Sequence, residues 1–339
     1  MHDNGWLNYH LYYHQDVDHA IRRFVHPLVA GLLRSDWIDS FFFVRYPLGG
    51  PHLRLRLRPQ PETSALVAEA AEAQARDFLA GWPSTSKISR ESILRTNQKL
   101  MASDPHELDA SIYPDNTFLR FPFRPEVERY GGPELWRGSL DFFAVSSATA
   151  LDLLSRYSSE SRSRQLALAF RVLACQALSF ARDEEDLVST LRYAVDLWGT
   201  RMPGALAKGD RAFVEQRAMF VQLFERALYL LANGSSAAAT AEEEAKAQLG
   251  EAARRLAWTV RAADRDMHQR IGTSQLHMTA NRLGLSNAEE VYLSRILTRL
   301  ASELMAGKLP PAVEANLPLR DLLPDALARV MAASSPTLV

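Results

Sequence analysis

The stretch FFFVRYPLGGPHLRLRLR, residues 41–58, decides the fold. Its second part, His52–Arg58, alternates apolar and cationic residues with a period of two, which is the period of side chains along a β-strand. The leucines can then pack into a core, while His52 and the three arginines line the opposite face. The apolar run Phe41–Tyr46 is typical of a central strand, and Gly49-Gly50-Pro51 predicts the turn between the two strands.

The cationic face of this hairpin has two interpretations. A half-buried antiparallel strand with a solvated basic face is the plainer one. In the other, the face is partly buried, and an anion must offset guanidinium groups that repel one another. A hairpin anchored in the core is a rigid place for a carboxylate or phosphate receptor, and this favours the second interpretation.

The composition is ordinary for a soluble globular protein, with 47% hydrophobic and 23% charged residues in a chain of 339. The net charge of −1 does not favour binding to nucleic acid or to a membrane. The single cysteine, Cys175, indicates a reducing compartment or an inert core thiol. No apolar run reaches the roughly 18 residues that a membrane span needs, and no signal peptide is recognisable, so we expect a cytoplasmic protein.

The pattern along the chain predicts an α+β protein, with a small antiparallel sheet layer in the N-terminal third and a mostly helical C-terminal half. We expect a sheet-containing subdomain over 1–135, a helical subdomain over 136–309, and a tail over 310–339 that packs with the same unit. Further extended segments are expected at Trp6–Tyr13 and Asn116–Tyr130. Apolar residues at three- and four-residue spacing predict helices over 16–33, 62–80, 137–157, 162–182, 184–199, 210–232, 240–268, 273–283 and 288–306.

A second informative segment joins an acid and a base to a pair of glycines. Glu126 and Arg129 come just before Gly131-Gly132, which permits a sharp chain reversal. The two charged residues could form a strand-end salt bridge, which is worth little when exposed. A corner pinned by glycines could equally place functional side chains, and the sequence leaves both readings open.

The third segment, residues 271–284, predicts a short helix. Thr273 or Ser274 could cap its beginning, and Gly284 could end it in the left-handed conformation.

His277 and Asn281 would share one face of this helix because they are four residues apart. A histidine with the usual pKa of about 6.5 can exchange protons near neutral pH. A core histidine bonded to a neighbour is the alternative. We interpret His10, His14 and His19 as structural or surface residues. No Cys/His spacing in the sequence suits a metal ion and no glycine-rich motif suits a nucleotide, so we predict neither a metal nor a cofactor.

Together the three segments resemble the C-terminal elimination domain of class I lanthipeptide dehydratases, which also occurs as stand-alone proteins in thiopeptide and related ribosomal-peptide pathways. The resemblance covers about Trp6 to Arg299. The family that the chain resembles also includes thiopeptide pyridine synthases. The motifs that carry it are Pro51-His52-Leu53-Arg54-Leu55-Arg56, Pro125-Glu126 with Arg129-Tyr130-Gly131-Gly132, and His277-Met278 with Asn281-Arg282-Leu283. One segment departs: many members have an Asp-Ser pair where this chain has Phe143-Ala144-Val145-Ser146-Ser147.

The resemblance implies that the protein expels glutamate from glutamylated Ser or Thr, leaving dehydroalanine or dehydrobutyrine. By position, Arg54, Arg56 and Arg129 would hold the glutamyl group, Glu126 would orient an arginine, and His277 would transfer a proton. Residues expected to contact the substrate are His52, Tyr130, Asn281 and Arg282.

The implied partners follow from the same resemblance. Full-length relatives use glutamyl-tRNA to glutamylate a precursor peptide, and this chain is too short for that part. We therefore expect a precursor peptide with a leader as substrate and a separate glutamylating enzyme as partner. Neither direct nucleic-acid binding nor membrane attachment is expected, and a homodimer is compatible with the sequence.

Two other functions remain open. A pyridine synthase would join two dehydroalanines by a formal aza-[4+2] cycloaddition, lose water and expel the leader peptide. Ser286 and Tyr292 could serve that reaction, although a helix cap and a packing residue are the simpler interpretation. A non-enzymatic protein could instead bind a leader peptide as an added strand at the sheet edge, and Arg56 and His277 would then be dispensable. The match of the arginines and His277 favours elimination.

Overall fold

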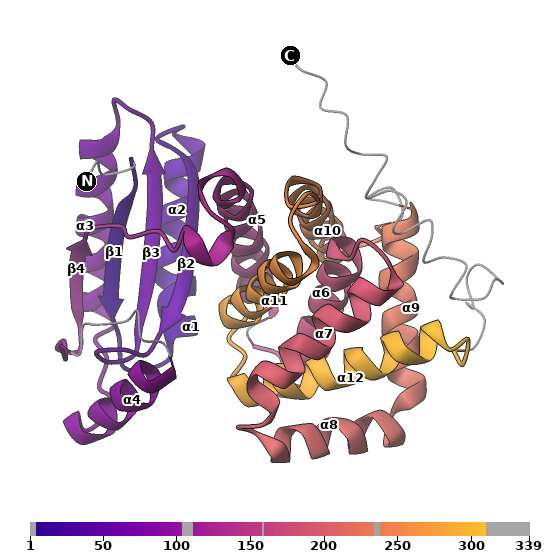
Figure 1. Ribbon diagram of the computed structural model, residues 1–339. Helices are drawn as coiled ribbons and strands as arrows, with labels where there is room; N and C mark the ends of the chain where they lie inside the picture. The colour runs from indigo at the N-terminus through magenta and orange to yellow at the C-terminus, as the bar shows by residue number, and fades with distance from the viewer. Residues whose placement is uncertain (1–4, 104–110, 158, 234–237, 310–339) are drawn as a thin grey trace. The chain divides into compact units, whose positions relative to one another are not determined.

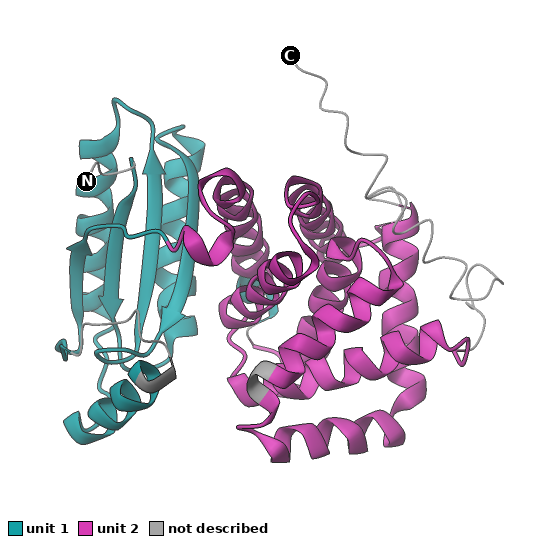
Figure 2. Ribbon diagram, in the orientation of Figure 1, with its two compact units in different colours: residues 1–125, 154–158 teal, residues 126–153, 159–339 magenta. Residues whose placement is uncertain are grey.

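The computed structural model describes residues 5–103, 111–157, 159–233 and 238–309. It divides the chain into two compact units, shown in Figure 2. Unit 1 comprises residues 1–125 and 154–158, and unit 2 comprises residues 126–153 and 159–339. The expected tail 310–339 lies outside the described residues. The expected subdomain limits stay predictions.

Unit 1 contains a four-stranded antiparallel sheet with the strand order β2-β3-β1-β4, which confirms the α+β prediction (Figure 1). The strands are β1 (Leu7–Tyr12), β2 (Ile38–Tyr46), β3 (His52–Pro59) and β4 (Thr117–Phe121). The predicted hairpin is β2 and β3, and Gly49 and Gly50 in its turn both have positive φ. The extended segment expected at Asn116–Tyr130 was predicted too long, because β4 already ends at Phe121.

Helices cover one face of this sheet. They are α1 (Val17–Ala20), α2 (His26–Arg34) and α3 (Ser64–Gly81), joined by the π-helical turn Ile21–Val25 between α1 and α2. Leu53, Leu55 and Leu57 are at most 1% exposed on this face, and each contributes about 2 kcal/mol through burial. The ring of Phe24 meets the edge of Phe118, which stacks on Tyr9 and so links helix to sheet.

A single helix over 16–33 was predicted, but the structure has a π turn there. The turn ends two residues before Pro27, whose ring nitrogen has no N–H for a helical hydrogen bond. The polar segment beyond α3 forms α4 (Arg90–Ser103), and Asn97 of this helix accepts a hydrogen bond from the Gly49 N–H at 2.9 Å. This contact fastens the hairpin turn of β2 and β3.

Unit 2 is helical. After the 3₁₀ turn Glu128–Tyr130, its helices are α5 (Pro133–Tyr157), α6 (Arg162–Phe180), α7 (Glu184–Gly199), α8 (Pro203–Glu215), α9 (Arg217–Asn233), α10 (Ala241–Thr259), α11 (Arg265–Arg282) and α12 (Asn287–Met305). The last residues of α5 are assigned to unit 1. Helix α11 packs against α6 and α7, and α12 packs against α7 and α8.

Three of the predicted helix boundaries were wrong. The segment 210–232 belongs to two helices, α8 and α9, which are separated at Gln216. The segment 240–268 ends at Thr259, and α11 begins at Arg265 with Asp264 as its cap. Gly284 does end this region with φ 76°, as predicted.

Thr273 and Ser274 therefore lie inside α11 and do not cap it. Gly272-Thr273-Ser274 is poor in strong helix formers, and this local preference suggested a helix start. Packing overrides it, because a Cβ at Gly272 would lie 2.5 Å from the ring of Phe180 in α6. Gly272 has an unfavourable helix propensity, but its missing side chain allows α11 and α6 to approach closely at this point.

We expect Gly272→Ala to lower the free energy of unfolding by about 1–3 kcal/mol, because the added methyl group collides with Phe180. Gly31→Ala in α2 is the matched control, since a Cβ there meets nothing within 4 Å and should raise stability by about 0.5–1 kcal/mol. Urea unfolding of both variants checks this. Equal stabilisation by the two alanines would contradict the packing argument.

Candidate functional site

The face of the sheet opposite the helices carries the arginines of β3, as the alternation predicts. We call it the arginine face. His52, Arg54, Arg56 and Arg58 of β3 point to it. The strand register brings further side chains alongside, since His10 of β1 and Val44 of β2 flank Arg54, while Asn8 and Phe42 flank Arg56.

Aromatic rings hold the guanidinium groups of this face. The Cζ atom of Arg54 lies 3.7 Å from the centre of the Tyr46 ring. The Cζ atom of Arg56 lies 4.9 Å from the centre of the Phe42 ring and 5.1 Å from that of Phe123. Such cation–π contacts contribute about 0.5–2 kcal/mol each and fix the plane of the cation.

Arg58 differs from the other two arginines of β3. It forms an ion pair with Asp39, and its guanidinium lies over Trp6 at 5.6 Å. Both partners of this pair are more than a third exposed, so it contributes little to stability.

Two buried imidazoles complete the arginine face. The rings of His10 and His52 stack at 4.9 Å, and His10 also stacks on Phe121 at 4.3 Å. Burial, followed by the charge of Arg54, lowers the pKa of His52 to about 3. Burial, followed by His52, lowers the pKa of His10 to about 2. Both imidazoles are therefore neutral at pH 7 and add no positive charge beside the arginines.

His10 was not predicted to be part of this face. The interpretation as structural or surface rested on its position in a strand of unknown register. The observation that places His10 on this face is its pairing with Arg54 between β1 and β3, and only the sheet register reveals this pairing.

In unit 2 the glycine corner brings Arg129 to α11. Arg129 pairs with Glu126 at 2.9 Å, and its Nε–H donates to the Ser274 hydroxyl at 3.1 Å. Ser274 in turn donates to the Tyr130 hydroxyl at 3.3 Å. Both readings of the corner contain the ion pair, but the hydrogen bond to Ser274 is an additional constraint on Arg129. The sequence analysis considered Ser274 only as a helix cap.

Arg282 is buried in the same unit beside the segment that departs from the family pattern. Its Nη1 donates to the Ser146 hydroxyl at 3.0 Å, and its Cζ lies 5.0 Å from the Phe143 ring. Phe143 also meets the ring of buried Tyr130 at 5.2 Å. Burial lowers the pKa of Arg282 to about 9 and raises the pKa of Tyr130. At the position where the resemblance leads us to expect an Asp-Ser pair, this chain thus offers an aromatic ring and a hydroxyl to an arginine.

His277 lies three residues beyond Ser274 on α11 and pairs with α12. Its Nδ1 is 2.7 Å from a carboxylate oxygen of Glu290, and Glu290 is buried. This carboxylate–imidazole pair places the proton on Nδ1 and orients the ring. The sequence offered no signal for Glu290, because only the packing of α12 brings it to His277.

Ser286 caps α12 in a capping box with Glu289, which confirms the simpler interpretation of this residue. Tyr292 lies in a surface pocket together with Lys208, whose Nζ is 5.5 Å from its ring. The expected substrate contacts stay predictions for all six residues named for them: His52, Tyr130, Asn281, Arg282, Ser286 and Tyr292.

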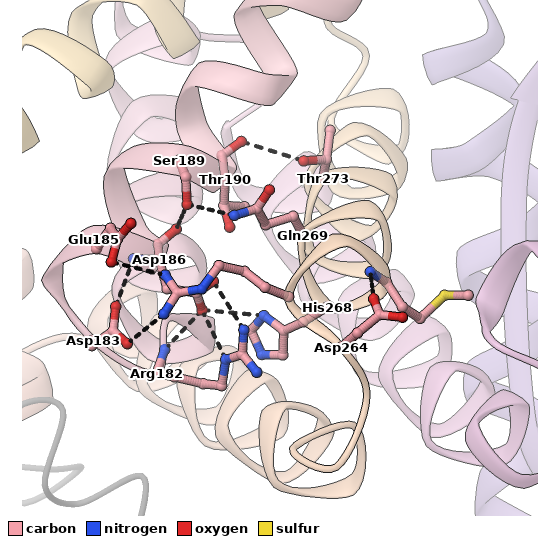
Figure 3. A network of polar contacts seen from close by, with 12 residues as sticks. Arg182, Asp183, Glu185, Asp186, Ser189, Thr190, Asp264, His268, Gln269 and Thr273 are labelled. Atoms are coloured by element: carbon pink, nitrogen blue, oxygen red, sulfur yellow. Dashed lines mark hydrogen bonds and ion pairs between the residues drawn. The ribbon is translucent and has the colours of Figure 1, made fainter.

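A buried polar network fastens α11 to α7 (Figure 3). Nδ1 of His268 lies 3.1 Å from Asp186, and both side chains are fully buried. Burial opposes ionisation of Asp186, but the adjacent His268 imidazole and the hydrogen bond from the Arg182 N–H outweigh it and lower its pKa to about 2. Gln269 donates to Ser189 at 2.7 Å one residue further along α11. The sequence analysis did not predict this network, which fixes the helix that carries Ser274 and His277.

The structure thus forms two groups of predicted site residues. His52, Arg54 and Arg56 lie together in unit 1. Glu126, Arg129 and Tyr130 lie together beside Ser274 in unit 2, which also holds His277, Asn281 and Arg282. That both groups serve one glutamyl-binding site stays a prediction.

The described ranges of the chain contain no group of three or more His, Cys, Asp or Glu side chains arranged to hold a metal ion. None of the helices in the same ranges combines the length and the apolar character that crossing a membrane requires.

The family model described as lantibiotic biosynthesis dehydratase C-term matches residues 6–301 of the chain. The solved structure of TbtD, a pyridine synthase from thiomuracin biosynthesis, aligns with a TM-score of 0.73 and 18% identity, covering 89% of this chain and 99% of TbtD. MibB, a tRNA-dependent lantibiotic dehydratase from Microbispora sp. 107891, aligns with a TM-score of 0.62 and 20% identity over 90% of this chain.

This chain spans 29% of the length of MibB. The structure of TsrL aligns with a TM-score of 0.57 and 18% identity, covering 95% of this chain and 98% of TsrL. No curated protein sequence matches the chain. At these identities the solved structures establish the fold.

The buried imidazoles predict a pH-dependent stability. In the unfolded chain each histidine titrates near pH 6.5, while in the folded protein the pKa of His10 is about 2 and that of His52 about 3. The unfolded state therefore binds more protons below pH 6.5, and stability falls as the pH falls. We expect each imidazole to account for a loss of about 1.5 kcal/mol between about pH 6.5 and pH 5.

His10→Phe should remove one of these contributions, because a phenyl ring can stack on Phe121 and His52 without titrating. Urea unfolding of wild type and variant at the two pH values measures the difference. An unchanged pH dependence in the variant would show that His10 is not held neutral by the fold.

Proposed function

Because the chain belongs to the lantibiotic biosynthesis dehydratase C-terminal family, we propose that it eliminates glutamate from glutamylated Ser or Thr of a precursor peptide. The family and its structural neighbours indicate an enzyme that modifies ribosomally made peptides. Glutamate elimination is the specific reaction that we propose within this general role. The observation that carries it is the arginine face, where Arg54 and Arg56 are oriented by aromatic rings beside neutral imidazoles.

The arginine face suits an anionic leaving group. Planar guanidinium groups bind a carboxylate through two parallel hydrogen bonds, and rings that fix their planes reduce the entropy lost on binding. Because His10 and His52 stay neutral, the positive charge of this face is confined to the arginines. We assign Arg54 and Arg56 to the carboxylate of the glutamyl group.

The second group of residues suits proton removal. In the proposed step a base takes the α-proton of the modified residue, its electrons form the Cα=Cβ bond, and the Cβ–O bond breaks to release glutamate. We assign Nε2 of His277 as the base, since Glu290 holds the proton on Nδ1 and stabilises the imidazolium that forms. Arg129, oriented by Glu126 and Ser274, is the third cation for the glutamyl group.

This proposal implies two partners. The substrate is a precursor peptide with a leader, and a separate enzyme adds the glutamyl groups. The cytoplasm, where ribosomal peptides are made, is the proposed location.

The similarity to TbtD favours a second candidate function, since the alignment covers 99% of that pyridine synthase. In this alternative the protein joins two dehydroalanines of a peptide by a formal aza-[4+2] cycloaddition. The glutamyl-binding arginines are then not needed for turnover.

Two peptides separate these functions. Purified protein should release free glutamate from a pre-glutamylated Ser peptide, leaving dehydroalanine that mass spectrometry detects. A bis-dehydroalanine peptide should stay unchanged. Conversion of the second peptide alone, with loss of its leader, would refute elimination and support the cycloaddition. Binding of both peptides without turnover would support the leader-binding alternative.

Arg56→Lys tests the carboxylate-binding role. The substitution keeps the positive charge but loses the planar fork, so kcat/KM for elimination should fall about 10- to 100-fold. Arg58→Lys is the matched control on the same strand, because its ion pair with Asp39 is exposed, and its rate should change less than about threefold. Equal rates for both variants would argue against a two-point contact between Arg56 and carboxylate.

His277→Ala should lower kcat for elimination about 100-fold or more, because it removes the proposed base. Glu290→Gln should have a smaller effect of about tenfold, since the amide still accepts a hydrogen bond from Nδ1 but does not stabilise the imidazolium. Single-turnover assays measure both. Full activity of a folded His277→Ala variant would exclude His277 as the base.

A further inference from the structure

We infer that His52 is a positioning residue, an imidazole with its proton on Nδ1 that holds the Arg54 guanidinium in the orientation needed for the carboxylate. The purpose of this positioning rests on the proposed function. The positioning itself is a property of unit 1 and can be tested without substrate.

A chain of hydrogen bonds determines the tautomer of His52. Nδ1 of His52 lies 2.9 Å from the carbonyl oxygen of Gly50, and a carbonyl oxygen only accepts. Nδ1 must therefore carry the proton. Nε2 of His52 is then the acceptor of the neutral ring, and it lies 3.2 Å from Nε of Arg54, which only donates.

The two-residue period of a strand explains how Gly50, His52 and Arg54 form this chain of hydrogen bonds. Positions 50, 52 and 54 are each two residues apart, so the side chains of His52 and Arg54 emerge on the same face of β3. Gly50 has φ 118°, a conformation that L side chains rarely adopt, and a Cβ there would lie 2.5 Å from Nε2 of His14. The orientation of the carbonyl that accepts the hydrogen bond from the His52 Nδ1–H thus depends on glycine at position 50.

The surroundings of His52 keep it neutral. The ring is 1% exposed and lies against the rings of His10, Tyr12 and Tyr46. Burial, followed by the charge of Arg54, lowers its pKa to about 3. A protonated ring would present an N–H to the N–H of Arg54 and could no longer accept its hydrogen bond.

Arg54 is held by two contacts of different kinds, an aromatic ring and an imidazole. Its guanidinium lies 3.7 Å from the Tyr46 ring, which fixes the plane, while the hydrogen bond from Nε to His52 fixes rotation within that plane. Arg56 is held by Phe42 and Phe123. The two neighbouring arginines are thus oriented by different means, and a substitution at His52 should affect Arg54 selectively.

Nuclear magnetic resonance of the full chain tests the positioning first. In long-range ¹H–¹⁵N spectra of the wild type, the His52 ring, identified by its loss in His52→Gln, should show the neutral Nδ1–H tautomer from about pH 8 to about pH 5. An Nε2–H tautomer, or titration within that range, would overturn the inference. This result needs no variant beyond the one used for assignment.

The second measurement follows hydrogen exchange of the Arg54 Nε–H. We expect exchange to become about tenfold faster or more in His52→Leu, which cannot accept the hydrogen bond, and to slow again in His52→Gln, whose amide oxygen can. The Nε–H of Arg56 is the internal control and should be unaffected. Equal exchange of Arg54 in wild type and His52→Leu would refute the positioning role, and if His52→Leu does not fold, the tautomer result decides.

The elimination assay then tests the purpose. His52→Leu should raise KM for the glutamylated peptide about tenfold and leave kcat nearly unchanged, with most of the loss recovered in His52→Gln. In an Arg54→Ala background, His52→Leu should have no further effect, because it acts through Arg54. Additive losses would contradict this. If the wild type eliminates nothing while the spectra show the expected tautomer and exchange, the proposed function fails and the positioning of Arg54 stands.

Discussion

The structure depends on the burial of Leu53, Leu55 and Leu57 against the helices of unit 1. Because side chains alternate along a strand, this burial sends Arg54 and Arg56 to the opposite face. A slip of one residue would reverse every side chain and push the arginines into the apolar layer, at a cost that no pairing of the strands could offset. The register of β3, and with it the arginine face, is therefore strongly specified.

Neighbouring guanidinium groups on the arginine face repel one another. Their repulsion must be reduced in a way that keeps the affinity of the face for anions. Aromatic rings provide this at Arg54 and Arg56, since their faces attract cations but do not neutralise them. The two histidines contribute by remaining uncharged, because their burial removes the water that would stabilise an imidazolium.

Helix α11 is held by different forces from those that hold the sheet. Many of its buried positions are polar, and hydrogen bonds to α7 replace part of the usual apolar contact. Such a helix is specific in its placement, because each buried polar group must meet one particular partner. The same polarity made its beginning hard to recognise, since Gly272-Thr273-Ser274 suggests a helix start by local preference. Close packing on Phe180 explains why the helix continues through it.

The sequence by itself determined the α+β class, the β2–β3 hairpin, the arginine face and the glycine corner. These features depend on side-chain periodicity and on turn residues, which act over a few neighbouring positions. Only the tertiary structure decided that His10 joins the arginine face, that Ser274 binds Arg129 and that Glu290 binds His277. These partners are distant in the chain, and their pairing is set by strand register and helix packing. The local alternation fixes which face of β3 each residue takes, but it does not encode which residue of β1 lies opposite or which helices pack together, because these pairings result from the free energy of the whole fold.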